Sequence, residues 1–150
     1  MTADPLAIYQ GVLDNTSAAL IARDDAAFLR HIIYPHTLVT ETQTLHIPDR
    51  ATALHHFLRF SDSLAALGIT EYIRIADHAA FDGPDKIAGR HKSHLIRGAV
   101  RAVPPFNNEI TLERIEGGLW GVRVSRHKAA YVAWPDILPT SPTGGSDAKN

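Results

Sequence analysis

The sequence contains no cysteine among its 150 residues. This absence excludes disulfide bonds, thiolate zinc sites, iron–sulfur clusters and a cysteine nucleophile. An excess of one charge sign is also missing, because 15 lysine and arginine residues stand against 16 aspartate and glutamate residues, for a formal net charge of −1. A nucleic-acid partner is therefore not expected, since neutralising phosphates needs a basic surplus.

Long apolar runs are absent as well. No run approaches the roughly 18 residues that a membrane span requires, and the first residues lack the basic region of a secretory signal. We therefore expect no membrane partner and a cytoplasmic location. The content of 45% hydrophobic and 21% charged residues is typical of an ordinary globular domain.

The length fits one domain. We place this domain at residues 1–138, because residues 139–150 (PTSPTGGSDAKN) are polar and rich in proline, glycine and serine. Such a composition predicts a disordered tail with no part in the fold.

Helices are predicted in the first half of the chain. The first helix begins after Asp4, a capping residue, and carries apolar residues at three- and four-residue steps. A second, short helix follows Asp24 and ends at Tyr34-Pro35, because the residue before proline avoids the helical region. Two short strands, 37–40 and 42–47, precede a third helix that begins after Asp49 and ends near residue 68.

The second half predicts a meander of antiparallel strands at 69–81, 86–103, 109–116 and 119–127. Turns are expected at 82–85 and at Gly117-Gly118. The second strand is longer than usual, and Gly89 and Gly98 inside it suggest bends or bulges. Helices followed by strands predict an α+β fold.

Four segments carry a resemblance to a known superfamily. They are the N-terminal amphipathic helix with its short successor, LVTETQTLHIPDRATALHHFLRF, GRHKSHLIRGAVRAV, and the closing hairpin LERIEGGLWGVRVSR. Over residues 5–130 the chain resembles the nuclear transport factor 2-like superfamily. That superfamily includes SnoaL-like polyketide cyclases, ketosteroid isomerases and scytalone dehydratase.

The resemblance implies three N-terminal helices packed in the concave face of a strongly curved, mostly antiparallel sheet. This cone-shaped α+β barrel usually encloses an apolar pocket that is open at one end. Many members form homodimers through the outer face of the sheet. Members include enzymes and non-catalytic binders, so the fold alone does not decide the function.

Strand pairing predicts which residues enter the cone. Pairing across residues 82–85 places Ile73 opposite His94 and Asp77 opposite Arg90, and the face with Ile73 and Ile75 is the more apolar. We assign that face to the interior, which makes His94 a candidate catalytic acid or base and Asp77 its helper. The structural alternative is a buried histidine bonded to a backbone carbonyl and an ordinary cross-strand ion pair.

Further residues are predicted to line the pocket. Glu113 is expected to share a face with Trp120 and Val122, either as a buried carboxylate with a raised pKa or at the rim. Helical core residues would close the pocket, and two histidines would stand near its mouth. The remaining candidates are Tyr9, Leu13, His31, His36, Phe57, Phe60, Ile73 and Ile75.

Nine histidines raise the question of a metal site. His91 and His94 are three positions apart on a strand and point to opposite faces, and the adjacent His55 and His56 diverge on a helix. We expect no metal and no cofactor. Two functions remain: a cofactor-independent isomerase, dehydratase or cyclase acting on a small, largely apolar molecule, or a non-catalytic dimeric module that binds a ligand or a protein.

Overall fold

The computed structural model describes residues 4–128 and the backbone of 132–133 and 136–137. The helices are α1 (Pro5–Ala22), α2 (Asp25–Leu29) and α3 (Arg50–Ala66). Each begins after an aspartate whose carboxylate accepts a backbone N–H bond in the first turn, namely Asp4, Asp24 and Asp49. This capping satisfies a donor that has no partner inside the helix, so these three helix starts agree with the prediction.

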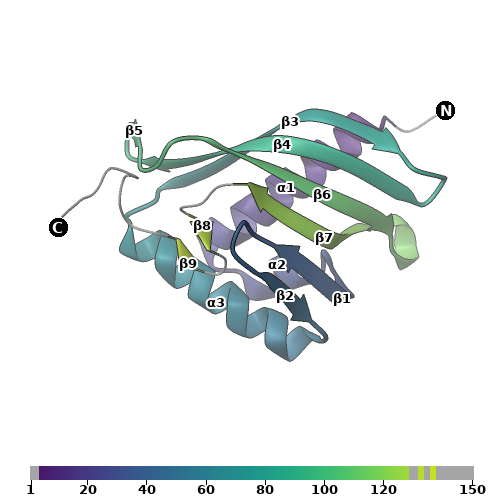
Figure 1. The fold of residues 1–150 in the computed structure, drawn as a ribbon, viewed down its shortest axis with the longest axis horizontal. Helices are drawn as coiled ribbons and strands as arrows, with labels where there is room; N and C mark the ends of the chain where they lie inside the picture. The colour runs from purple at the N-terminus through teal and green to yellow at the C-terminus, as the bar shows by residue number, and fades with distance from the viewer. Residues whose placement is uncertain (1–3, 129–131, 134–135, 138–150) are drawn as a thin grey trace.

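The strands form a curved sheet in the order β2-β1-β7-β6-β4-β3, with β5 paired to β4 (Figure 1). Their bounds are β1 (Ile32–Val39), β2 (Thr44–Ile47), β3 (Glu71–Phe81), β4 (Lys86–Arg97), β5 (Val100–Arg101), β6 (Phe106–Arg114) and β7 (Trp120–Lys128). β1 and β7 run parallel, and the other pairings in this sheet are antiparallel. β8 (Val132–Ala133) and β9 (Asp136–Ile137) form a separate small pair.

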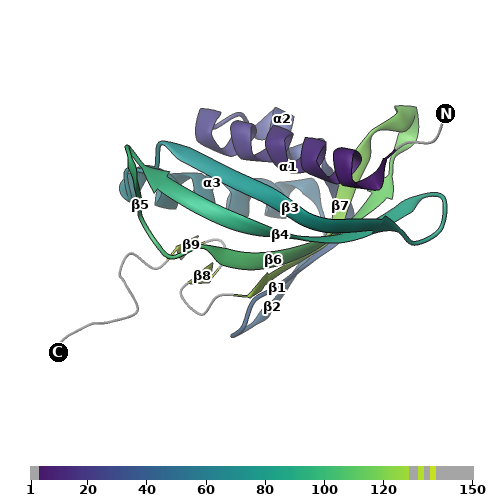
Figure 2. The ribbon, with the colours of Figure 1, turned by 90° about the horizontal axis from the view of Figure 1, so that it is seen from above.

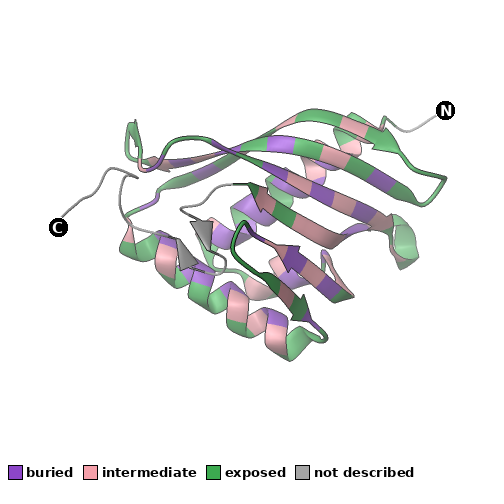
Figure 3. Ribbon diagram, in the orientation of Figure 1, coloured by how far each residue is buried: buried purple, intermediate pink, exposed green. Residues whose placement is uncertain are grey.

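The helices pack against one face of the sheet, and the core lies between these layers (Figure 2). One buried cluster joins α1 to the middle strands through Tyr9, Leu13 and Leu112. Another joins α3 to β3 and β4 through Phe57, Phe60 and Leu95. Buried residues alternate with exposed or partly buried ones along β4 and β6 (Figure 3), as expected for strands with one covered face.

Two predicted boundaries are wrong. Tyr34-Pro35 does not end a helix, because it lies inside β1 with a cis peptide bond. The long strand predicted for 86–103 is two strands separated at Gly98, which has a φ of +66°. Glycine adopts this left-handed backbone without steric cost.

The closing hairpin turns at Glu116–Gly118, and both of its glycines have positive φ. The predicted tail, 139–150, lies outside the described residues. Within the described part of the chain, no helix combines the length and apolarity needed to cross a membrane.

Candidate functional site

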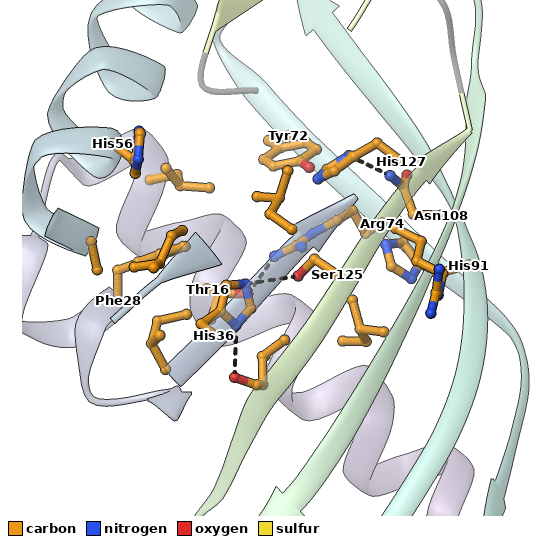
Figure 4. A pocket seen from close by; sticks show the side chains of 18 residues that line it. Thr16, Phe28, His36, His56, Tyr72, Arg74, His91, Asn108, Ser125 and His127 are labelled. Atoms are coloured by element: carbon orange, nitrogen blue, oxygen red, sulfur yellow. Dashed lines mark hydrogen bonds between the residues drawn. The ribbon is translucent and has the colours of Figure 1, made fainter. Parts of the chain in front are cut away.

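A partly enclosed cavity of about 60 Å³ lies between the concave face of the sheet and the helices (Figure 4). Its apolar walls come from helices α1 to α3 and from the strands on both sides. The polar lining residues are Thr16, His36, His56, Tyr72, Arg74, His91, Asn108, Ser125, Arg126 and His127. The described lining residues include no aspartate and no glutamate. The hydrogen bonds of the polar lining residues determine which ligand groups the cavity can bind.

Tyr9 and His91 form a buried pair beneath the cavity. The Tyr9 hydroxyl accepts a hydrogen bond from the Ile110 N–H at 3.3 Å and lies 2.9 Å from His91 Nδ1. Burial raises the pKa of Tyr9 above its usual value, so the hydroxyl stays protonated. Because its oxygen already accepts from the Ile110 N–H, its own hydrogen is directed at His91 Nδ1 and donates a hydrogen bond there. The hydrogen of the neutral imidazole is then on Nε2. Burial, together with the charge of Arg74, lowers the pKa of His91 to about 2.

A second chain of hydrogen bonds crosses β4, β6 and β7. Ser93 Oγ donates to Asn108 Oδ1 at 2.6 Å, and Asn108 Nδ2 donates to His127 Nδ1 at 2.6 Å. Burial is the largest cause that lowers the pKa of His127 to about 4, and the charge of Arg74 adds to it. The Asn108 amide therefore fixes a neutral imidazole, as Tyr9 does for His91.

His36 completes the set of neutral imidazoles. Its Nδ1–H donates to the Val122 carbonyl at 3.1 Å, and its Nε2 lies 3.5 Å from Ser125 Oγ. These two contacts are drawn as dashed lines in Figure 4. Burial lowers the pKa of His36 to about 4, and the nearby Arg123 charge contributes. At neutral pH the cavity therefore holds uncharged histidines on three strands.

Replacing Tyr9 with phenylalanine is expected to lower the free energy of unfolding by about 2 kcal/mol. The change leaves His91 Nδ1 and the Ile110 N–H buried without their partner, and such unsatisfied groups cost about 1–3 kcal/mol. Tyr34→Phe is the matched control, because the buried Tyr34 hydroxyl has no hydrogen-bond partner among the described residues. Urea unfolding of both variants checks this prediction, and equal losses would contradict it.

The predicted inner face of β3 and β4 is wrong. Ile73 does pair with His94, and Ile75 pairs with Lys92, as predicted. However, Ile73 and Ile75 are 40% and 53% exposed, and His94 lies on the same outer face. His91 and His94 do point to opposite faces, but His91 is the inward one.

The predicted pairing and inward position of Asp77 are also wrong. It falls at a β-bulge between Ala76 and His78, so Arg90 pairs with His78 instead of Asp77. The side chain of Asp77 is exposed. Neither Asp77 nor His94 lines the cavity, so neither is placed to act there as an acid or a base.

Glu113 does not share a face with Trp120 and Val122. The residues paired with these two are Arg114 and Leu112. Glu113 instead accepts two hydrogen bonds from Arg123, at 3.0 and 3.2 Å. These bonds lower its pKa, opposite to the rise expected for the buried alternative.

The other candidates fall into two groups. His36 and Val122 line the cavity. The second group is buried but does not line the cavity: Tyr9, Leu13, His31, Phe57, Phe60 and Trp120. His31 is held by a 2.9 Å bond between its Nδ1 and the Trp120 carbonyl.

The sequence reasoning missed Arg74, His91, Asn108 and His127. Arg74 and His91 lie on the strand face opposite the one assigned to the interior, and Asn108 lies just before the strand predicted at 109–116. Within the part of the chain that the structure describes, no group of three or more histidine, aspartate or glutamate side chains could hold a metal ion.

Comparison with known proteins identifies the fold. No protein-family model matches the sequence, and no curated protein is similar to it. Among solved structures, a nuclear transport factor 2-like protein of unknown function from Shewanella oneidensis has a TM-score of 0.65. It is 14% identical, and the similarity covers 84% of this chain and 100% of that one.

Two further structures are similar. A domain of unknown function with a cystatin-like fold from Nostoc punctiforme has a TM-score of 0.68 at 11% identity, over 85% of this chain and 78% of that one. A ketosteroid isomerase-like protein from Erwinia carotovora has a TM-score of 0.60 at 10% identity, over 85% and 97%. The expected architecture is confirmed: this chain has the nuclear transport factor 2-like, or cystatin-like, α+β cone fold.

Proposed function

We propose that this protein binds a small, largely apolar molecule in the cone, without a metal or cofactor. The observation that carries the proposal is the cavity lining, in which apolar walls surround neutral hydrogen-bonding groups already held by partners. Ligand sites typically combine apolar walls with a few oriented polar groups. The volume of about 60 Å³ holds a short chain or part of a ring, because an enclosed cavity that takes benzene is about 150 Å³. The rest of a ring would extend through the open side of the cavity.

Binding, rather than acid–base catalysis, is the function that this site supports better. An efficient general base has a pKa near the working pH. The pKa values of His36 and His91 are lowered to about 4 and about 2, so both are weak bases at neutral pH. The described lining residues also offer no carboxylate to act in their place.

Methyl chemical shifts of the full chain test this proposal. The probes are benzyl alcohol, phenylacetamide and phenylacetate. At least one of them is expected to shift the methyl signals of Leu38, Ile110 and Val122, which line the cavity. The methyl signals of Ile73 and Ile75 on the outer face are expected to stay in place.

A pair of α3 variants separates cavity binding from surface binding. Ala53 is buried and lines the cavity, whereas Ala65 is exposed on the same helix. Ala53→Leu should weaken binding by about tenfold or more because the added carbons fill the site, and Ala65→Leu should not change it. Equal effects of the two variants, or no shift with any probe, would contradict the proposal.

The predicted homodimer and cytoplasmic location stay predictions. The exposed isoleucines Ile73 and Ile75 on the outer face of the sheet support a second copy at that face, since exposed apolar side chains gathered on one face often mark interfaces.

A further inference from the structure

Among the described lining residues, two carry a permanent charge, and both are arginines. Arg74 reaches in from β3 and is half-buried, and the exposed Arg126 stands at the rim. The described lining residues contribute no negative charge. An unpaired charge away from bulk water is costly, so the setting of Arg74 needs an explanation.

The hydrogen bonds of Arg74 orient its guanidinium without neutralising it. Nε donates to Ser17 Oγ at 2.7 Å, and Nη2 donates to the Leu13 carbonyl at 3.0 Å and to Thr16 Oγ1. The guanidinium carbon also lies 4.8 Å from the centre of the Tyr72 ring. Every one of these partners is neutral, and Nη1 makes no hydrogen bond to a described residue.

Other arginines of the fold are arranged differently. Arg23, Arg114 and Arg123 each form an ion pair with a carboxylate, at 2.5 to 3.0 Å. Those pairs are at the surface or close to it. Arg74, which lines the cavity, has no such pair among the described residues. Residues of α1 thus hold the Arg74 guanidinium in place through neutral groups. Its positive charge has no carboxylate partner among the described residues.

The neighbouring groups favour a ligand that accepts hydrogen bonds. Tyr9 places the hydrogen of His91 on Nε2, and the Asn108 amide places the hydrogen of His127 on Nε2. Both imidazoles are therefore hydrogen-bond donors at Nε2. A carboxylate accepts hydrogen bonds at both oxygens and pairs well with a planar guanidinium.

We propose that Arg74 anchors a carboxylate, and that the ligand class is the small apolar carboxylic acid with one ring or a short chain. This inference rests on the proposed function, because it names the ligand class of the same cavity. The apolar walls would receive the ring or chain, while the carboxylate meets the guanidinium beside α1.

The test compares phenylacetate with phenylacetamide, which has nearly the same shape but no charge. We expect phenylacetate to bind the full-length wild type at least about tenfold more tightly, measured by the methyl shifts of Ile110 and Val122. Arg74→Gln should reduce this preference to about twofold or less. Arg90→Gln removes an exposed arginine from β4 and should leave the preference intact.

Arg74→Lys covers the case in which Arg74→Gln does not fold, because it keeps the charge and should keep a preference for the carboxylate. Equal or tighter binding of the amide by the wild type would overturn the inference and leave the proposed function standing. The inference would also be overturned if folded Arg74→Gln kept the preference for phenylacetate, or if folded Arg74→Lys lost that preference. Failure of every probe to bind in the cavity would instead remove the proposed function itself.

Discussion

Replacing Gly89 with alanine is expected to lower the free energy of unfolding by about 3 kcal/mol, the upper end of the usual cost of overpacking. A β-carbon at Gly89 would lie 2.4 Å from Tyr9 Cε1 and 2.6 Å from the His78 carbonyl oxygen. The carbonyl belongs to the paired strand and cannot turn away as a side chain can. The Tyr9 ring would have to move, which also breaks its hydrogen bond to His91.

Gly11→Ala is the control for this prediction. An added β-carbon at Gly11 meets no atom within 4 Å, and Gly11 lies inside α1. Alanine in a helix interior is favoured over glycine by about 0.5–1 kcal/mol, so this variant should be slightly more stable than the wild type. Urea unfolding measures the stability of both variants. A decrease in the free energy of unfolding below about 0.5 kcal/mol for Gly89→Ala would contradict the prediction, because the strands would then move apart at little cost in free energy.

The helices were predictable because their signals are local. Asp4, Asp24 and Asp49 each cap a helix as the sequence predicts. The pairing of Ile73 with His94 was predictable for a similar reason, since a short turn fixes the register of the strands next to it. The bulge beyond Ala76 was not marked by glycine or proline, and it shifted the pairing of Asp77.

The faces of β3 and β4 were not predictable from apolarity. Ile73 and Ile75 made the outer face look like the core, whereas the inner face holds Arg74, His91 and Ser93. A polar inner face is stable here because α1 and β6 supply hydrogen-bond partners from distant parts of the chain. Strand alternation identifies two faces, but it does not say which face the helices cover.

Gly89 carried information about helix packing that the prediction did not use. The sequence reasoning took it as a bend or a bulge, yet its neighbours show a close approach of the Tyr9 ring. Glycine inside a strand can mark either situation. Together, Gly89 and Tyr9 on the first helix could have indicated which face of β4 packs against that helix.

Acidification is expected to destabilise the fold well before the carboxylates titrate. Burial lowers the pKa of His36 and of His127 to about 4 and that of His91 to about 2, from the usual 6.5. Unfolding therefore takes up protons at these histidines once the pH falls below about 6.5. The stability that they contribute is present above that pH and is lost as the pH falls toward the folded pKa of each group.

The size of the effect follows from the number of protons taken up. Three buried histidines that take up close to one proton each at about pH 5 give a slope of roughly 4 kcal/mol per pH unit. Urea unfolding at about pH 7, 6 and 5 measures this slope. His91→Gln should reduce it by about a third, whereas His46→Gln, at an exposed position on β2, should not. A free energy of unfolding that stays constant from about pH 7 to about pH 5 would mean that these imidazoles accept protons inside the fold.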